Sequence, residues 1–414
     1  MTRRLRTLIF SVSALLLGLA SAGCGATSTS AVVAAGKPSP TGASPASPTP
    51  SAGQSSPQSA LPSCPARVFS DMTEAQRVGQ LFLVGIAGDP VSDVAQAVAA
   101  YHFGSLLSAG NLTAGAAGLQ QLTSAYQSLA SARATGGVRF FIAANQEGGE
   151  VQSLRGPGFS AIPSALSQGS LSPSVLEQQA ALWGRELRSA GFNLNLAPVM
   201  DVVPAGTADQ NQPIGALERE FGYSPATVAA HGVAFIQGMQ EAGVATTAKH
   251  FPGLGRVRGN TDFTAGVVDS TTGPHDPYLG SFQGAIDAGV PFVMVALATY
   301  TRIDARHLAV FSPEVMRVIL RQQMHFNGVI VSDDLGAATA VAGVSPGARG
   351  IDFLAAGGDL ITSQSLPAAA AMDSAILARV SADSAFRALV NSAVMRILSA
   401  KQAYGLLPCP RRPA

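Results

Sequence analysis

The chain has 414 residues, a formal net charge of +1 and only 12% charged residues. This length allows one large domain or two to three ordinary ones. Removing the three arginines of the first six residues with a leader changes the charge to +1 − 3 = −2. No basic stripe then remains to indicate a nucleic-acid partner. Between residues 65 and 405, no charge-free apolar run approaches the roughly 20 residues that a membrane span needs.

The first 24 residues have the pattern of a signal peptide. A basic start precedes an apolar run from Leu8 to Leu19, and small residues then lead to Cys24. Ser21-Ala-Gly-Cys24 is similar to a bacterial lipobox, with Ser21 where Leu or Val is preferred. We therefore expect a lipid on Cys24, which would hold the exported protein on the outer face of the cytoplasmic membrane. Simple secretion is the alternative.

Residues 25–63 are rich in Ser, Pro, Ala, Thr and Gly, a composition typical of a flexible tether. We expect the folded domain to cover residues 64–410. Cys64 and Cys409 lie at its two edges, and each is followed by proline. In an oxidising compartment an isolated pair of cysteines favours a disulfide, which here would join the ends of the domain. Two free thiols are the alternative.

Short apolar runs alternate with helical stretches through the rest of the chain. The candidate strands are 79–86, 104–108, 139–144, 193–199, 244–249, 291–297, 328–332 and 359–362. The clearest helices are 116–134, 173–190, 225–242, 277–288, 313–323 and 366–404. Four of these helices begin at Ser or Asp before Pro, which is a cap followed by proline in the first turn.

Eight strands, most of them followed by a helix, predict an α/β fold with a single (β/α)8 TIM-type barrel. An open doubly wound sheet is the alternative. It would be expected to carry a phosphate-binding glycine fingerprint after its first strand, and Gly85-Ile-Ala-Gly88 does not supply one.

Polar residues follow the predicted strands where a barrel places its active site, just after the carboxyl ends. They are Asn145 to Gly149 after the third strand, Asp201 and Arg219 after the fourth, Lys249, His250 and Asp262 after the fifth, and Asp333 with Asp334 after the seventh. Lys249 ends an apolar run, where a charge is costly unless it meets a ligand or a partner. A buried lysine paired with a carboxylate, without chemistry, is the alternative. The clustering favours an enzyme over a structural protein.

Asp333 and Asp334 are the strongest candidates for chemistry. Side chains alternate along a strand, so we expect one carboxylate to face the barrel axis as a nucleophile and the other to turn outward, as a cap or ion-pair partner. No Gly-x-Ser-x-Gly elbow follows a strand, and the six scattered histidines form no zinc-binding pair. We therefore expect no metal and no cofactor. Carboxylates with one Lys–His pair and Arg219 suit a neutral, hydroxyl-rich substrate, and sugar hydrolysis is the natural reaction.

Six stretches in family order, over roughly residues 68–405, resemble glycoside hydrolase family 3. The likeness is to its single-domain bacterial exo-β-N-acetylglucosaminidases, in particular exported actinobacterial lipoproteins. The stretches are Gln146-Glu-Gly-Gly149, Asn195-Leu-Ala-Pro-Val199 with Asp201, Arg219-Glu-Phe-Gly222, Lys249-His-Phe-Pro-Gly253, Gly328-Val-Ile-Val-Ser-Asp-Asp-Leu335 and Ala355-Ala-Gly-Gly-Asp359.

The resemblance implies a retaining enzyme that removes terminal β-linked N-acetylglucosamine from cell-wall fragments, and we expect it to be a monomer. Asp333 matches the family's nucleophile. The substrate-binding set implied for the terminal sugar is Lys249, His250, Arg219, Asn145 and Glu147.

The chain departs from the family in its proton donor. The family uses a histidine two residues after an aspartate, in a loop after the fifth strand. Here Asp262 is followed by Phe263 and Thr264, and the loop looks slightly longer. Because a threonine hydroxyl does not transfer protons near neutral pH, we predict that Asp262 itself is the acid/base. Its pKa would rise as the loop closes over substrate and expels water. The alternative is that Asp262 orients another proton donor.

Two further departures lie near the third strand. Asn145 stands where the family has an aspartate, and Ser153 stands at a basic position with only Arg155 nearby. Two other functions therefore stay open. One is a sugar-binding protein with weakened turnover, and the other is a β-glucosidase or phosphorylase on the same scaffold.

Overall fold

The structure is a computed structural model that describes residues 63–409. The predicted signal peptide, Cys24 and most of the tether lie outside the described residues. At the centre are eight parallel strands: β1 (Phe82–Ala87), β2 (Ser105–Ser108), β3 (Phe141–Ala144), β6 (Leu194–Asn195), β7 (Ala245–Phe251), β9 (Phe292–Val295), β12 (Val329–Ser332) and β13 (Ile361–Ser363).

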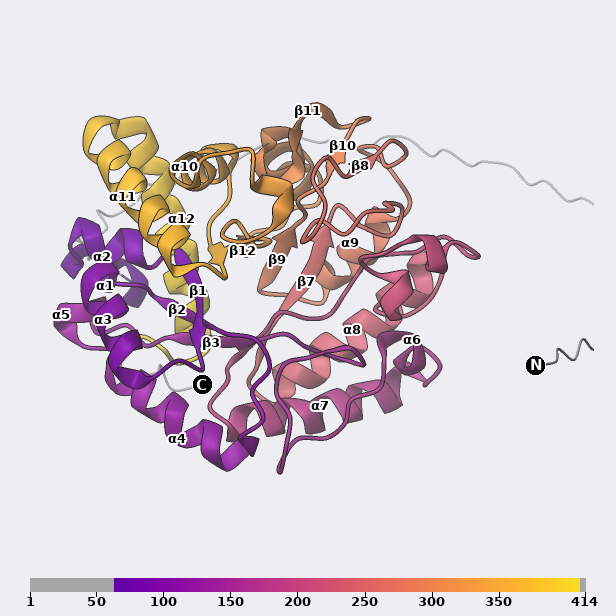
Figure 1. The fold of residues 1–414 in the computed structure, drawn as a ribbon, viewed down its shortest axis with the longest axis horizontal. Coiled ribbons are helices and arrows are strands. Elements are labelled where there is room, and N and C mark those ends of the chain that lie inside the picture. Colours follow the sequence, from indigo (N-terminus) through magenta and orange to yellow (C-terminus); the bar gives the residue numbers. More distant parts are fainter. Residues whose placement is uncertain (1–62, 410–414) are drawn as a thin grey trace, which may run out of the picture. The chain divides into compact units, whose positions relative to one another are not determined.

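These strands close into a ring (Figure 1). Each strand pairs with its neighbours in chain order, β1 pairs with β13, and a bridge between Val331 and Leu360 joins the seventh strand to the start of the eighth. The predicted TIM-type barrel is therefore confirmed. Each of the eight predicted apolar runs overlaps one of its strands, although β1, β7 and β13 end one or two residues beyond the predicted run.

Helices surround the barrel: α1 (Cys64–Asp71), α2 (Glu74–Gly79), α3 (Val91–Tyr101), α4 (Gly115–Ser128), α5 (Ala132–Thr135), α6 (Ala165–Gln168), α7 (Pro173–Ser189), α8 (Pro225–Glu241), α9 (Leu279–Asp287), α10 (Pro346–Ala356), α11 (Leu366–Ala382) and α12 (Ser384–Ala403). The Ser-Pro signals hold at α7 and α8, where the hydroxyls of Ser172 and Ser224 accept hydrogen bonds from the backbone N–H groups of Val175 and Thr227.

Three predicted helices differ from the structure. The stretch 116–134 is divided between α4, which ends at Ser128, and α5, which begins at Ala132. The stretch 366–404 is not one helix, because Asp383 is extended and its carboxylate caps α12 by accepting from the N–H groups of Ala385 and Phe386. The stretch 313–323 forms a π-helix, η4 (Glu314–Gln323). A hydrophobic pattern alone does not separate a π-helix from an α-helix.

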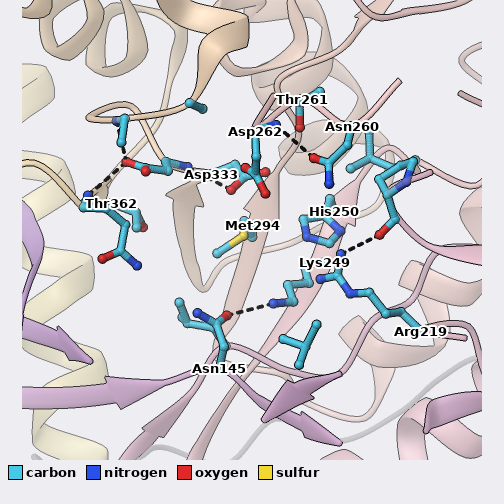
Figure 2. A pocket seen from close by; sticks show the side chains of 18 of the residues that line it. Asn145, Arg219, Lys249, His250, Asn260, Thr261, Asp262, Met294, Asp333 and Thr362 are labelled. Carbon is cyan, nitrogen blue, oxygen red and sulfur yellow. Dashed lines mark hydrogen bonds between the residues drawn. The ribbon is translucent and has the colours of Figure 1, made fainter. Parts of the chain in front are cut away.

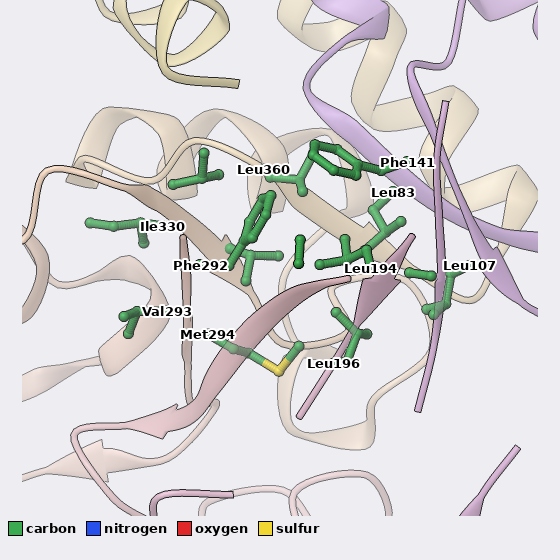
Figure 3. Packing of buried hydrophobic residues seen from close by; sticks show 14 of the residues in the cluster. Leu83, Leu107, Phe141, Leu194, Leu196, Phe292, Val293, Met294, Ile330 and Leu360 are labelled. Atoms are coloured by element: carbon green, nitrogen blue, oxygen red, sulfur yellow. The ribbon is translucent and has the colours of Figure 1, made fainter. Parts of the chain in front are cut away.

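Apolar side chains of the strands fill the barrel, as Figure 3 shows for Leu83, Leu194 and Phe292. Phe141 and Phe292 meet edge to face, with ring centroids 5.4 Å apart. At the amino-terminal end of the strands this core is completed by Lys401 of α12. Its Nζ donates to Gln80 Oε1 (2.7 Å) and to the Gly104 carbonyl (2.6 Å). Burial lowers the pKa of Lys401 to about 7.

The two edges of the domain are joined covalently. Cys64 and Cys409 form a disulfide across a sequence separation of 345 residues. Of the two states that the sequence left open, the structure has the disulfide and not the free thiols. Among the described residues, no helix is both long and apolar enough to cross a membrane.

Short elements extend from the carboxyl ends of the barrel strands. They are the hairpin β4 (Gln146–Gly148) and β5 (Val151–Gln152), the small sheet β8 (Val268–Asp269), β10 (Thr299–Tyr300) and β11 (Asp304–Leu308), and the 3-10 turns η1 (Ala208–Gln210), η2 (Gly215–Leu217), η3 (Ala309–Phe311) and η5 (Thr339–Val341). Because these excursions all leave from one end of the barrel, they build a wall around its opening.

Candidate active site

A cavity of about 500 Å3 opens at the carboxyl ends of the strands (Figure 2). Most of the predicted site residues line it together, although they come from separate excursions. They are Asn145 after β3, Arg219 in the excursion after β6, Lys249 and His250 in β7, Asp262 in the loop after β7, and Asp333 after β12. The barrel therefore brings together groups that lie up to 188 residues apart in sequence (333 − 145).

Lys249 and His250 both face this cavity, although they are consecutive in β7. Successive side chains of a regular strand point to opposite sides. The pairing of β7 with β9 shifts register between Ala248 and Phe251, so the strand is irregular at these two residues. The irregularity explains how one strand can supply two neighbouring polar groups to one cavity.

Lys249 and Arg219 share a buried carboxylate, that of Glu147. Arg219 pairs with it through two bonds of 2.8 Å, and Lys249 Nζ lies 2.6 Å from Oε1. Burial alone would raise the pKa of Glu147, but the two cations outweigh it and lower the pKa to about 2. Burial lowers the pKa of Lys249, and Glu147 acts against this effect.

Glu147 does not itself line the cavity. The sequence analysis placed it among the substrate-binding residues, and the structure instead puts it behind Lys249 and Arg219. It is 5% exposed and has both oxygens occupied by the two cations. Its role is to position the cations that reach the cavity.

His250 is held by Asp201, which is fully buried. The ring Nδ1 donates to Asp201 Oδ2 at 2.8 Å, and the other carboxylate oxygen accepts from the N–H of Leu254 at 2.7 Å. This contact orients the imidazole and leaves Nε2 available for a substrate hydroxyl. Asp201 is thus a positioning residue for His250.

The two neighbouring aspartates have different surroundings. Asp334 Oδ1 accepts from three backbone N–H groups, those of Gly336, Ala337 and Gln364. Asp333 accepts one bond on Oδ1, from the N–H of Asp334, and its Oδ2 accepts none from the described residues. Both aspartates touch the cavity, so the expectation that one would point outward is wrong. The expected division of roles remains, because Asp334 organises the turn and Asp333 keeps an oxygen for reaction.

Asp262 lines the same cavity as Asp333, and the two side chains are drawn next to each other in Figure 2. Its loop is fixed by two main-chain bonds to η5, from Thr339 N–H to the Asp262 carbonyl (3.0 Å) and from Ala340 N–H to the Thr261 carbonyl (3.1 Å). The Asn260 side chain accepts from the Asp262 N–H at 2.9 Å. Burial and then the negative charge of Asp333 raise the pKa of Asp262, while nearby cations partly oppose the rise. Two carboxyl groups in one cavity, one of them with a raised pKa, are the arrangement of an acid and a nucleophile.

The remaining departures from the family pattern can now be placed. Thr264 does not line the cavity, whereas Asp262 does. Asn145 lines it and accepts a bond from Lys249 Nζ at 3.0 Å. Arg155 points back to its own loop, where it donates to the carbonyls of Gln152 and Gly149. Of the cavity's polar groups, Asn260, Thr261, Thr362 and Gln364 were not predicted, because they lie outside the recognised motifs.

Across residues 63–409, no three or more His, Cys, Asp and Glu side chains gather in a way that could hold a metal ion. The cavity instead presents three carboxylates, two cations, an imidazole and amides above an apolar floor that includes Leu107, Leu196 and Met294. This set can hold a hydroxyl-rich ring and perform displacement at a carbon that lies between the Asp333 and Asp262 carboxylates.

The model of the glycosyl hydrolase family 3 N-terminal domain matches residues 73–400. The chain belongs to this family. A Beta-hexosaminidase of Stenotrophomonas maltophilia (strain R551-3) is 35% identical over 233 residues, which are 53% of this chain and 65% of that protein. The match thus spans slightly less than two thirds of that relative.

Two solved structures extend the family comparison. The crystal structure of the Beta-N-acetylhexosaminidase from Beutenbergia cavernae DSM 12333 is 46% identical, with a TM-score of 0.78, and covers 80% of this chain and 99% of that one. A family 3 beta-N-acetylglucosaminidase from Paenibacillus sp. str. FPU-7 is 27% identical, with a TM-score of 0.72, and covers 83% and 65%. The similarity to the Beutenbergia protein therefore extends over nearly the whole of that protein.

Proposed function

We propose that this family 3 chain is a retaining, exo-acting β-N-acetylhexosaminidase that hydrolyses terminal β-linked N-acetylglucosamine. The observation that carries the proposal is that the Asp333 and Asp262 carboxylates line one cavity together with Lys249 and His250. The identity of the sugar rests on the likeness to the Beutenbergia and Stenotrophomonas proteins. Cell-wall fragments, as the source of the sugar, are part of the proposal.

In the first step, an Asp333 oxygen attacks the anomeric carbon while protonated Asp262 gives its proton to the glycosidic oxygen. The bond from the anomeric carbon to that oxygen breaks, the leaving group departs as an alcohol, and a covalent glycosyl-enzyme ester remains on Asp333. The free oxygen of Asp333 suits this role, and the raised pKa of Asp262 keeps a larger fraction of that carboxyl group protonated.

In the second step, ionised Asp262 takes a proton from a water molecule, whose oxygen attacks the same carbon. The ester bond to Asp333 breaks, the sugar leaves with its original anomeric configuration, and both carboxyl groups return to their starting state. Lys249, His250 and Asn145 hold the ring hydroxyls during both steps, and Glu147 and Asp201 hold Lys249 and His250 in place.

The test is hydrolysis of the β-1,4-linked disaccharide of N-acetylglucosamine, followed by proton NMR of the first-formed product. We expect the β-anomer to appear first, with no change in products when phosphate is added. Binding without turnover would instead indicate a sugar-binding protein. A sugar phosphate as product would indicate a phosphorylase, and faster cleavage of a β-glucoside would indicate a β-glucosidase.

We also propose that the chain is exported and anchored through a lipid on Cys24. The signal-peptide pattern of residues 1–24 supports this proposal, as does the Cys64–Cys409 disulfide, since structural disulfides persist in oxidising compartments. In a bacterial host fed radiolabelled palmitate, the chain should carry the label in the membrane fraction. Cys24→Ala should lose the label, and a labelled Cys24→Ala chain would contradict the lipid assignment.

A further inference from the structure

Phe263 has an unusual position for an apolar side chain. It is 80% exposed, whereas the other exposed large apolar side chains of the described residues are 37–48% exposed. It directly follows Asp262 and lines the same cavity as Asp333. Exposing a phenylalanine to water forgoes the stabilisation that burial of its ring would give. Such a ring is available to contact a ligand.

The backbone that carries Phe263 is held in place. Its N–H donates to the Asn260 carbonyl at 3.1 Å, and the preceding residues are bonded to η5 through Thr339 and Ala340. The ring is therefore presented from a turn that is fixed at its base. A ring fixed in this way binds a partner with a smaller loss of conformational freedom than one on an unrestrained loop.

The order of groups along the cavity indicates what the ring contacts. The terminal sugar is held at the buried end, where Lys249 is 2% exposed. The acid must touch the glycosidic oxygen, which lies between the terminal sugar and the leaving group. Phe263 adjoins that acid in sequence and is far more exposed than Lys249, so it lies on the leaving-group side.

We propose that Phe263 is a stacking platform for the leaving group and that this leaving group is itself a pyranose ring. The assignment rests on the proposed glycosidase activity and extends it, because it makes a β-linked oligosaccharide the preferred substrate over a glycoside of a small alcohol. A pyranose presents a face of C–H groups that buries apolar area against an aromatic ring. Phe263 is thus a specificity-determining residue and takes no part in proton transfer.

The test compares two substrates of one terminal sugar. The first is the β-1,4-linked disaccharide of N-acetylglucosamine, and the second is its β-glycosyl fluoride, whose leaving group is a single atom. Phe263→Ala should lower kcat/KM on the disaccharide by about 10-fold, equivalent to about 1.4 kcal/mol. On the fluoride it should change kcat/KM by less than about 2-fold, which also shows that the variant is folded. Phe263→Trp should retain disaccharide activity.

Tyr223→Ala is the matched control, because Tyr223 is an exposed aromatic residue (43%) that does not line the cavity. It should leave both substrates unaffected. If Phe263→Ala lowered kcat/KM equally on both substrates, the residue would act by maintaining the conformation of the loop, and the proposal would be overturned. An unchanged kcat/KM on the disaccharide would also overturn it.

A wild-type chain that cleaves neither substrate would contradict the proposed function. The stacking role of Phe263 would then be tested by measuring sugar binding instead of turnover. In the Asp333→Ala background, the disaccharide should bind about 10-fold more tightly than the monosaccharide, and adding Phe263→Ala should remove that difference. Equal dissociation constants for the two sugars in Asp333→Ala would overturn the platform.

Discussion

Each end of the barrel buries a lysine, and the two lysines have opposite surroundings. Lys249, at the carboxyl ends of the strands, is 2% exposed and lies 2.6 Å from the Glu147 carboxylate. Lys401, at the amino-terminal ends, is fully buried and bonds only to neutral oxygens of Gln80 and Gly104. Lys249 touches the cavity of Figure 2, and Lys401 touches the packed core.

This difference distinguishes a lysine that can bind substrate, Lys249, from a lysine that only packs in the core, Lys401. At the cavity, burial lowers the pKa of Lys249 but the Glu147 carboxylate opposes this effect and so favours the charged ammonium group, which can bind a hydroxyl. At the base, nothing of opposite sign compensates Lys401, and desolvation lowers its pKa to about 7. A buried lysine is therefore a candidate for function when it has both a counter-charge and a cavity.

The largest effect expected at the cavity end is loss of the acid. Asp262→Asn should lower kcat/KM on the disaccharide by about 10²–10⁴-fold, because a general acid normally contributes that much. On the glycosyl fluoride the loss of kcat/KM, which reports only the first step, should be much smaller, because fluoride departs without a proton. Equal losses on the two substrates would remove Asp262 from proton transfer.

The same residue should set the pH dependence. Protonated Asp262 is the active form in the first step, so kcat/KM should fall as pH rises through its raised pKa. In Asp262→Asn this basic limb should disappear from a pH profile measured with the disaccharide. A basic limb unchanged in Asp262→Asn would mean that another group supplies the proton.

The two lysines can be compared directly by substitution. Lys249→Met should lower kcat/KM by about 10–100-fold, the range expected when a charge-assisted hydrogen bond to substrate is lost. Glu147 would still be paired with Arg219 in this variant. Lys401→Met should leave kcat/KM within about 2-fold, since the base of the barrel does not reach the cavity. Similar losses of activity in both variants would contradict the assignment of Lys249 to substrate binding and of Lys401 to packing.

Lys401 should instead be visible in stability. Its pKa is about 7 in the folded chain and about 10.4 in an unfolded one, so the unfolded chain binds more protons between these values. The free energy of unfolding should therefore rise with pH across this window, by on the order of a few kcal/mol. Urea unfolding of Lys401→Met should lack this rise. A parallel pH dependence in wild type and variant would contradict the assignment.

Among the cavity residues, the smallest loss of activity should come from the second aspartate. Asp334→Asn keeps an oxygen that can accept from the N–H groups of Gly336, Ala337 and Gln364, so kcat should change by less than about 10-fold. The same change at Asp333 removes the nucleophilic carboxylate. A loss in Asp334→Asn as deep as that in Asp333→Asn would mean that the two carboxylates share the role.

The sequence was sufficient for the barrel, because apolar runs and Ser-Pro caps depend on local physical rules. It also identified Asp333, Lys249, His250 and Arg219, which the structure brings to one cavity. It did not show that Glu147 lies behind the cavity wall or that Asp201 orients His250, since both facts depend on packing between distant excursions. The exposure of Phe263 was also hidden, because an apolar residue next to a motif looks like core.

The central claim, that Asp333 forms the covalent intermediate, is tested most directly by trapping. The chain is incubated with a fluorinated N-acetylglucosaminyl fluoride that forms the glycosyl-enzyme faster than water removes it, and the labelled peptide is located by mass spectrometry. We expect one label, on Asp333, and none in Asp333→Ala. A label on any other residue, or an undiminished label in Asp333→Ala, would contradict the account.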